Sequence, residues 1–153
     1  MAGPPSNLPA SIHQRLLNHA KEQGRPLQEL LQYFAIERFL FRLSQSPHAT
    51  RFYLKGALML RLWDAPLSRP TIDVDLLGQQ VLSQDELEQV IKDICVQTVP
   101  DDGCRFEATT VRAQPIRLED QYGGIRVTFM SHIGKIRLNM QVDVGFGDVI
   151  VPG

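Results

Sequence analysis

The sequence predicts an α+β domain in which a mixed or antiparallel sheet carries its helices mainly on one side and follows an N-terminal pair of helices. Apolar residues recur at helical spacing early in the chain, and alternation of apolar and polar residues dominates its last part. Strand and helix patterns follow one another in between, as expected of this class. The 153 residues suffice for a single domain with its own core. We expect helices in residues 1–48 and the sheet region in residues 49–153.

The first two helices are predicted from boundary residues and from apolar spacing. Residues 11–21 indicate one helix that ends near Gly24, and Pro26 begins the next. The second helix carries a drifting apolar stripe at helical spacing, made of Leu27, Leu30, Leu31, Phe34, Ile36, Phe39, Leu40 and Leu43. Because this spacing is typical of core packing, we interpret its aromatic residues as core and not as a ligand-binding box.

Strand and helix patterns then alternate over a short distance. The stretch RFYL, residues 51–54, predicts a strand, and KGALMLRLW, residues 55–63, returns to helical spacing. In TIDVDLL, residues 71–77, apolar side chains alternate with Asp73 and Asp75. This is the period of a half-buried strand, so both carboxylates are expected on one face of it.

A third helical segment has the clearest start signal in the chain. Ser83 and Glu86 match the S-x-x-E capping box, and Leu82 and Leu87 flank it as a hydrophobic staple. The turn PDDG follows at residues 100–103.

Three successive strands are predicted for the C-terminal part, in CRFEATTVRA, GIRVTFMS and KIRLNMQVDVGF. In the last of these, Asn139, Gln141 and Asp143 alternate with apolar residues. One face of the strand is therefore apolar, and Asp143 points away from the core.

Composition excludes several classes of protein. Apolar residues make up 43% and charged residues 22%, as in ordinary globular proteins, and a net charge of -1 gives no global reason to bind nucleic acid or an anionic membrane. Cys95 and Cys104 fit no redox or zinc spacing, the histidines are scattered, and no segment approaches the roughly 18 apolar residues of a membrane span. We expect a cytoplasmic protein with reduced thiols and no membrane partner.

The D-x-D pair is the first candidate for chemistry. Two carboxylates at i and i+2 of a strand stand roughly 7 Å apart along the backbone, from which both can reach one or two cations. Mg²⁺ suits hard oxygen ligands and leaves coordination sites for substrate phosphates. A D-x-D pair also occurs at solvent-facing strand edges, and Asp143 alone is normal for the outer face of a sheet. Upstream, Gly56 lies where a strand pattern gives way to a helical one, and such a turn can bring backbone amides close to a phosphate.

Together these stretches resemble a known family. The N-terminal helices with FYLKGALMLRLW, RPTIDVDLLG and QVDVGFGD are similar to the AbiEii/AbiGii-type nucleotidyltransferase toxins, in the DNA polymerase β-like nucleotidyltransferase superfamily. The resemblance covers nearly the whole chain. It implies a nucleotidyltransferase-like fold and a bacterial toxin of a type IV toxin–antitoxin or abortive-infection system. It also implies Mg²⁺-dependent transfer of a nucleoside monophosphate from an NTP to an acceptor.

The resemblance assigns a role to each matching residue. Asp73, Asp75 and Asp143 match the three metal-binding catalytic carboxylates, with Asp148 of GFGD as a rival for the third position. The residues implied to bind the triphosphate are Lys55, Gly56, Ala57 and Arg69. The Mg²⁺ site is expected to hold two ions, and the acceptor in similar toxins can be tRNA or another macromolecule. A cognate antitoxin protein is the further partner implied.

Two departures from the family pattern leave alternatives open. Ala57 and Leu58 stand where many relatives have a second glycine and a hydroxyl residue, so phosphate binding would rest on backbone amides. The C-terminal helical region of the family is not found before Gly153, so a truncated or degenerate domain that binds nucleotide or antitoxin without turnover is the alternative. A metal-dependent nuclease is disfavoured, because no E-x-K or D-x-K lysine lies near Asp75 or Asp143.

Overall fold

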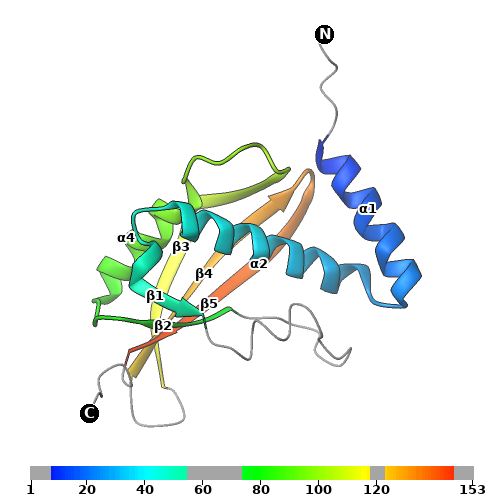
Figure 1. The fold of residues 1–153 in the computed structure, drawn as a ribbon. Coiled ribbons are helices and arrows are strands. Elements are labelled where there is room, and N and C mark those ends of the chain that lie inside the picture. The colour runs from blue at the N-terminus through cyan, green and yellow to red at the C-terminus, as the bar shows by residue number, and fades with distance from the viewer. Residues whose placement is uncertain (1–7, 55–73, 118–122, 147–153) are drawn as a thin grey trace.

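The computed structural model describes residues 8–54, 74–117 and 123–146. Within this part of the chain the helices are α1 (Leu8–Gln23), α2 (Leu27–Gln45) and α4 (Gln84–Cys95), with a short 3-10 helix, η1, at Ala49–Arg51. The strands are β1 (Phe52–Leu54), β2 (Val74–Gly78), β3 (Cys104–Arg117), β4 (Gly123–Ile133) and β5 (Ile136–Gly145). The predicted α+β class is confirmed (Figure 1). None of the helices in the described ranges is long and apolar enough to cross a membrane.

The strands form one mixed sheet in the order β1-β2-β5-β4-β3. Strands β2 and β5 are parallel, and every other neighbouring pair is antiparallel. The turn between β4 and β5 contains Gly134 at φ +63°, a left-handed conformation that glycine adopts without strain. The two strands with carboxylates of interest, β2 and β5, therefore lie side by side at the centre of the sheet (Figure 1).

Helices α2 and α4 lie on the same side of the sheet and bury its apolar face (Figure 1). Phe39 of α2 is fully buried, and its ring centroid lies 5.7 Å from that of Phe106 and 5.1 Å from that of Phe129. Leu87 and Ile91 of α4 are also fully buried. Aromatic contacts of this kind add specific geometry to a large apolar burial, so they fix how α2 sits on β3 and β4.

The helix starts and ends follow local signals. Ser83 caps α4: its hydroxyl accepts a hydrogen bond from the Glu86 amide at 3.0 Å, and its own amide donates to the Glu86 carboxylate at 2.8 Å, as the capping box predicts. Helix α1 ends at Gln23, just before the left-handed Gly24, but it begins at Leu8 and not near residue 11. Pro9 explains the earlier start, because proline is tolerated in the first turn of a helix.

Strand β3 is the longest strand and lies at one edge of the sheet. Its pairing with β4 shifts register between Glu107 and Arg112, and Pro115 lies near its end, as proline does in edge strands. Side chains of α4 cover the outer edge: Gln84 donates to the Ala113 carbonyl at 2.9 Å and Glu88 accepts from the Ala113 amide at 3.0 Å. This edge is therefore partly protected from pairing with another strand.

Candidate metal-binding carboxylate site

Asp75 and Asp143 are direct neighbours on the sheet. In the parallel pair β2–β5 the register matches Asp75 with Asp143. Val74 and Val142 are fully buried on the core face, so the aspartate side chains, which alternate with them, lie on the opposite face. Neighbouring strands are roughly 4.8 Å apart. Two carboxylates therefore stand beside each other on the polar side of the sheet, and both are half-buried.

An arginine from the next strand binds one of these carboxylates. Arg126 of β4 is the register partner of Asp143 in β5. Its Nε lies 2.9 Å from Asp143 Oδ1 and its Nη2 lies 3.2 Å from Asp143 Oδ2. The Asp143 side chain is 15% exposed and that of Arg126 is 35% exposed, so the pair is sheltered but open to solvent on the arginine side. Both oxygens of Asp143 are fixed by one bidentate contact.

Four strands contribute to one row across this face. The register runs from Gln114 in β3 to Arg126 in β4, Asp143 in β5 and Asp75 in β2. The row is polar from end to end, although it crosses strands whose other face is the core of the domain. This defines the candidate site, which we call the carboxylate row: Gln114, Arg126, Asp143 and Asp75.

The donor chemistry of the carboxylate row fits a divalent cation. Like charges directly opposite each other on adjacent strands destabilise a sheet, so Asp75 and Asp143 favour a cation between them. Carboxylate oxygens are hard ligands of the kind Mg²⁺ takes, and one or two carboxylates are a common protein share of such a site. The residues present therefore fit Mg²⁺, which would be held by Asp75 and Asp143.

Several residues predicted for the site lie outside the described residues. They are Lys55, Gly56, Ala57, Arg69, Asp73 and the rival third carboxylate Asp148. The structure thus brings together two of the three predicted carboxylates, Asp75 and Asp143. Over residues 8–54, 74–117 and 123–146 no three potential metal ligands converge, so the roles of Asp73 and of the triphosphate-binding residues stay predictions.

Sequence reasoning missed two members of the row, Gln114 and Arg126, of which Arg126 carries the charge. In GIRVTFMS, Arg126 stands between the apolar residues Ile125 and Val127. This alternation indicates only that the Arg126 side chain points away from the core face of the strand. Its position beside Asp143 depends on the register of the β4–β5 hairpin. The turn at Gly134 and Lys135 sets that register, and counting back from it would have paired the two residues.

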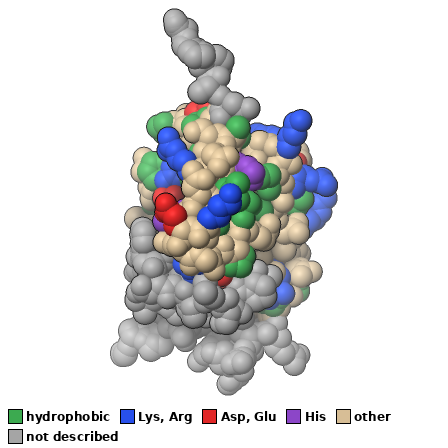
Figure 2. Space-filling model, turned by 90° about the vertical axis from the view of Figure 1, so that its right-hand side faces the viewer, with side chains coloured by type: hydrophobic (Ala, Val, Ile, Leu, Met, Phe, Trp, Pro, Cys, Tyr) green, Lys and Arg blue, Asp and Glu red, His purple; other side chains and the backbone are tan. Residues whose placement is uncertain are grey.

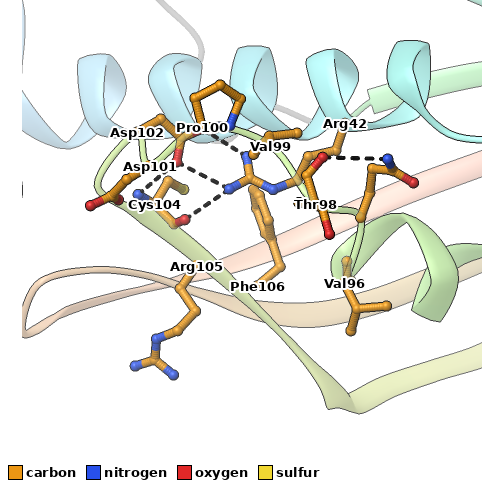
Figure 3. A pocket seen from close by; sticks show the side chains of 12 residues that line it. Arg42, Val96, Thr98, Val99, Pro100, Asp101, Asp102, Cys104, Arg105 and Phe106 are labelled. Carbon is orange, nitrogen blue, oxygen red and sulfur yellow. Dashed lines mark hydrogen bonds and ion pairs between the residues drawn. The ribbon is translucent and has the colours of Figure 1, made fainter.

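A second polar cluster lies on the core side, beneath the loop before β3 (Figure 3). Arg42 of α2 donates to both carboxylate oxygens of Asp102, at 2.9 and 3.0 Å, and to the Cys104 carbonyl at 2.9 Å. Its guanidinium carbon lies 4.8 Å from the Phe106 ring centroid. Because these contacts join α2 to Asp102, Cys104 and Phe106, Arg42 links α2 to the start of β3.

The pKa values of Asp102 and of the two cysteines near this cluster are shifted in directions that fit a structural role. Burial tends to raise the pKa of Asp102, but hydrogen bonds from Arg42 and the Cys104 amide, with the charges of Arg42 and Arg38, hold that pKa below its ordinary value. Burial raises the pKa of the Cys95 and Cys104 thiols to about 12. Neither cysteine is a nucleophile near neutral pH.

A shallow pocket of about 400 Å³ lies between α1 and α2. Its apolar floor includes Leu16, Leu30 and Phe34, with charged side chains such as Glu37 at its rim. Figure 2 looks at the molecule from the side of α1, where hydrophobic, basic and acidic side chains are interspersed over the described residues. The lining offers no convergent set of catalytic groups, so the carboxylate row is the better candidate site.

Comparison with known proteins points to a nucleotidyltransferase. A family model described as "Nucleotidyl transferase AbiEii toxin, Type IV TA system" matches residues 38–153, a span that includes Asp73, Asp75, Arg126 and Asp143. No curated protein gives a significant match.

Two solved structures from H. pylori are similar. A candidate nucleotidyltransferase is 16% identical, with a TM-score of 0.44 over 79% of this chain and 46% of its own. The protein JHP933 is 18% identical, with a TM-score of 0.46 over 84% of this chain and 47% of its own. This chain thus spans less than half the length of either protein.

Proposed function

The chain belongs to the AbiEii family of nucleotidyltransferase toxins of type IV toxin–antitoxin systems, and we propose that it transfers a nucleoside monophosphate from an NTP to an acceptor at the carboxylate row. The observation that carries the proposal is the register match of Asp75 with Asp143 on the polar face of the sheet. A D-x-D motif alone is common on strand edges. Here the neighbouring strand places a further carboxylate, that of Asp143, beside Asp75, and neither side chain contributes to the apolar core. The two carboxylates repel each other, and a cation bound between them would offset this repulsion.

Asp73, Asp75 and Asp143 would hold Mg²⁺, in a site for two ions. When bound, Mg²⁺ supplies neutralisation of triphosphate charge and polarises the α-phosphoryl group. Backbone amides at Gly56 and Ala57 bind the triphosphate in this proposal.

The side chains of Lys55 and Arg69 contribute further positive charge to triphosphate binding. The acceptor oxygen forms a bond to the α-phosphorus while the bond to pyrophosphate breaks, and the acceptor proton passes to Asp143 and then to solvent. Catalysis of this type depends mainly on positioning and electrostatics, which a rigid row of strand residues provides.

The family supports an antitoxin as partner, and the other partners of the reaction are part of the proposal. An NTP is the donor, a tRNA or another macromolecule is the acceptor, and an antitoxin protein binds the toxin. The net charge of the chain is -1, so a nucleic-acid acceptor would have to be bound by local basic residues and not by overall charge.

A transfer assay tests this proposal. The protein is incubated with each α-labelled NTP, Mg²⁺ and total cellular RNA or protein, and label in macromolecules is measured. Asp75→Asn and Asp143→Asn should each abolish transfer, while Glu107→Gln, on the same face but paired with His132 at 2.8 Å, should retain it. Transfer at the wild-type rate by Asp75→Asn or Asp143→Asn would refute the assignment.

A second candidate is a domain that binds nucleotide or antitoxin without turnover. One observation favours it: both oxygens of Asp143 already hold an internal cation, Arg126. Calorimetry separates the two functions. Mg²⁺-dependent NTP binding without labelled product supports the binding domain, whereas labelled product supports the transferase.

A further inference from the structure

Arg126 occupies the position in the carboxylate row where charge compensation is needed. It contacts both oxygens of Asp143, at 2.9 and 3.2 Å, and Asp143 lies beside Asp75. Burial alone does not hold the Arg126 side chain in this position, because the side chain is 35% exposed. A partly exposed arginine loses side-chain entropy when it is held in one geometry, and the bidentate contact in return fixes the orientation of the Asp143 carboxylate.

The other described arginines of this face, Arg105, Arg112 and Arg137, lie farther along the strands, with Arg105 opposite His132 in the register. Arg137 is in β5, six residues before Asp143, which corresponds to about 20 Å along a strand. Arg112 falls in the next row of the register, opposite Thr128, and donates to backbone carbonyls of its own strand. Among residues 8–54, 74–117 and 123–146, Arg126 is the cation that directly binds the carboxylate row.

We infer that Arg126 is a positioning residue for the proposed reaction: it fixes the Asp143 carboxylate and offsets the repulsion between Asp143 and Asp75 until a divalent cation is bound. This inference rests on the proposed function. Its physical basis is that Arg126 and a bound cation compensate the same pair of charges. The arginine should therefore stabilise the metal-free protein and, because both cations act on Asp143, reduce the affinity of the site for metal.

The test compares three variants at matched pH and ionic strength. Arg126→Gln removes the charge but keeps a hydrogen-bonding side chain, Arg126→Lys keeps the charge without the bidentate geometry, and Arg137→Gln is the control on the same face. Thermal unfolding is followed in EDTA and in excess Mg²⁺, and the Kd for Mn²⁺ is measured by calorimetry.

Arg126→Gln should have a lower Tm than the wild type in EDTA, and its metal-induced rise in Tm should exceed the wild-type rise by about 2–4 °C. Its Kd for Mn²⁺ should fall by about tenfold, as expected when a cation that opposes the metal is removed. Arg126→Lys should bind Mn²⁺ like the wild type, and both Arg126 variants should lower kcat. Arg137→Gln should behave like the wild type throughout.

An ordinary structural ion pair would give a different pattern. Arg126→Gln would then lower Tm equally in EDTA and in Mg²⁺, and its Kd for Mn²⁺ would be unchanged or higher. That pattern would overturn the inference while leaving the metal site intact. If the wild type itself showed neither Mn²⁺ binding nor a metal-induced rise in Tm, the proposed function would fail first. Should Arg126→Gln not fold, Arg126→Lys still decides the matter, because loss of Mn²⁺ binding in it would contradict charge compensation.

Discussion

Replacing Asp75 by asparagine should make the metal-free protein more stable. Asn keeps the size of the side chain and removes one of two like charges on register-matched residues of adjacent strands. At a separation of about 5 Å and an effective dielectric of about 20, Coulomb's law gives an upper limit of roughly 3 kcal/mol for the repulsion. Solvent screening and the Arg126–Asp143 pair reduce this, so we expect about 0.5–1 kcal/mol, the upper part of the range of cross-strand pair energies.

A change of this size corresponds to a rise in Tm of about 1–4 °C for a domain of this length. The assay is thermal unfolding by circular dichroism in EDTA, at low salt and at high salt, where screening should shrink the gain. In Mg²⁺ the order should reverse, because the wild type gains stability from the bound ion and Asp75→Asn does not. Glu107→Gln, which removes a carboxylate bound to His132, is the control and should not be stabilising. A lower Tm for Asp75→Asn in EDTA would refute the charge account of the row.

Three further predictions concern the scaffold. Ser83→Ala should lower the free energy of unfolding by about 1 kcal/mol in urea titrations, because it removes the cap of α4. The pKa of Asp102 is lower in the folded than in the unfolded protein. Its stabilising contribution is therefore complete above the unfolded pKa of about 3.9 and is lost as the pH falls through the folded pKa. Asp102→Asn should therefore lower Tm at pH 7 and flatten the loss of stability on acidification. Cys95 and Cys104 have their pKa raised to about 12, so both thiols should resist iodoacetamide at pH 8 in the native protein and react after unfolding.

The sequence predicted those features of the helices and strands that depend on residues close together in the chain. The capping box at Ser83 fixed the start of α4, and alternation placed Asp75 and Asp143 on the polar face of their strands. Strand β3 continues past the predicted end at Ala113 to Arg117, because Pro115 is tolerated in a strand at the edge of a sheet. The start of α1 was placed too late for a similar reason, since Pro9 fits its first turn.

Pairing between strands could not be derived from alternation. Which residue of β2 stands beside Asp143 is decided by how two distant segments pack on α2 and α4, and no local pattern encodes that register. The resemblance of the chain to nucleotidyltransferases grouped Asp75 with Asp143 but did not indicate Arg126. The arginine became visible only when the β4–β5 register was known.

The measurement that tests the central claim most directly is a Mn²⁺ titration of the wild type, Asp75→Asn and Asp143→Asn, with Glu107→Gln as the matched control. If Asp75 and Asp143 hold one cation between them, each Asp→Asn variant should weaken Mn²⁺ binding by at least about tenfold, the lower end of the loss seen when groups supporting a metal site are removed, while the control keeps the wild-type Kd. Wild-type Mn²⁺ affinity in both Asp→Asn variants would contradict the account.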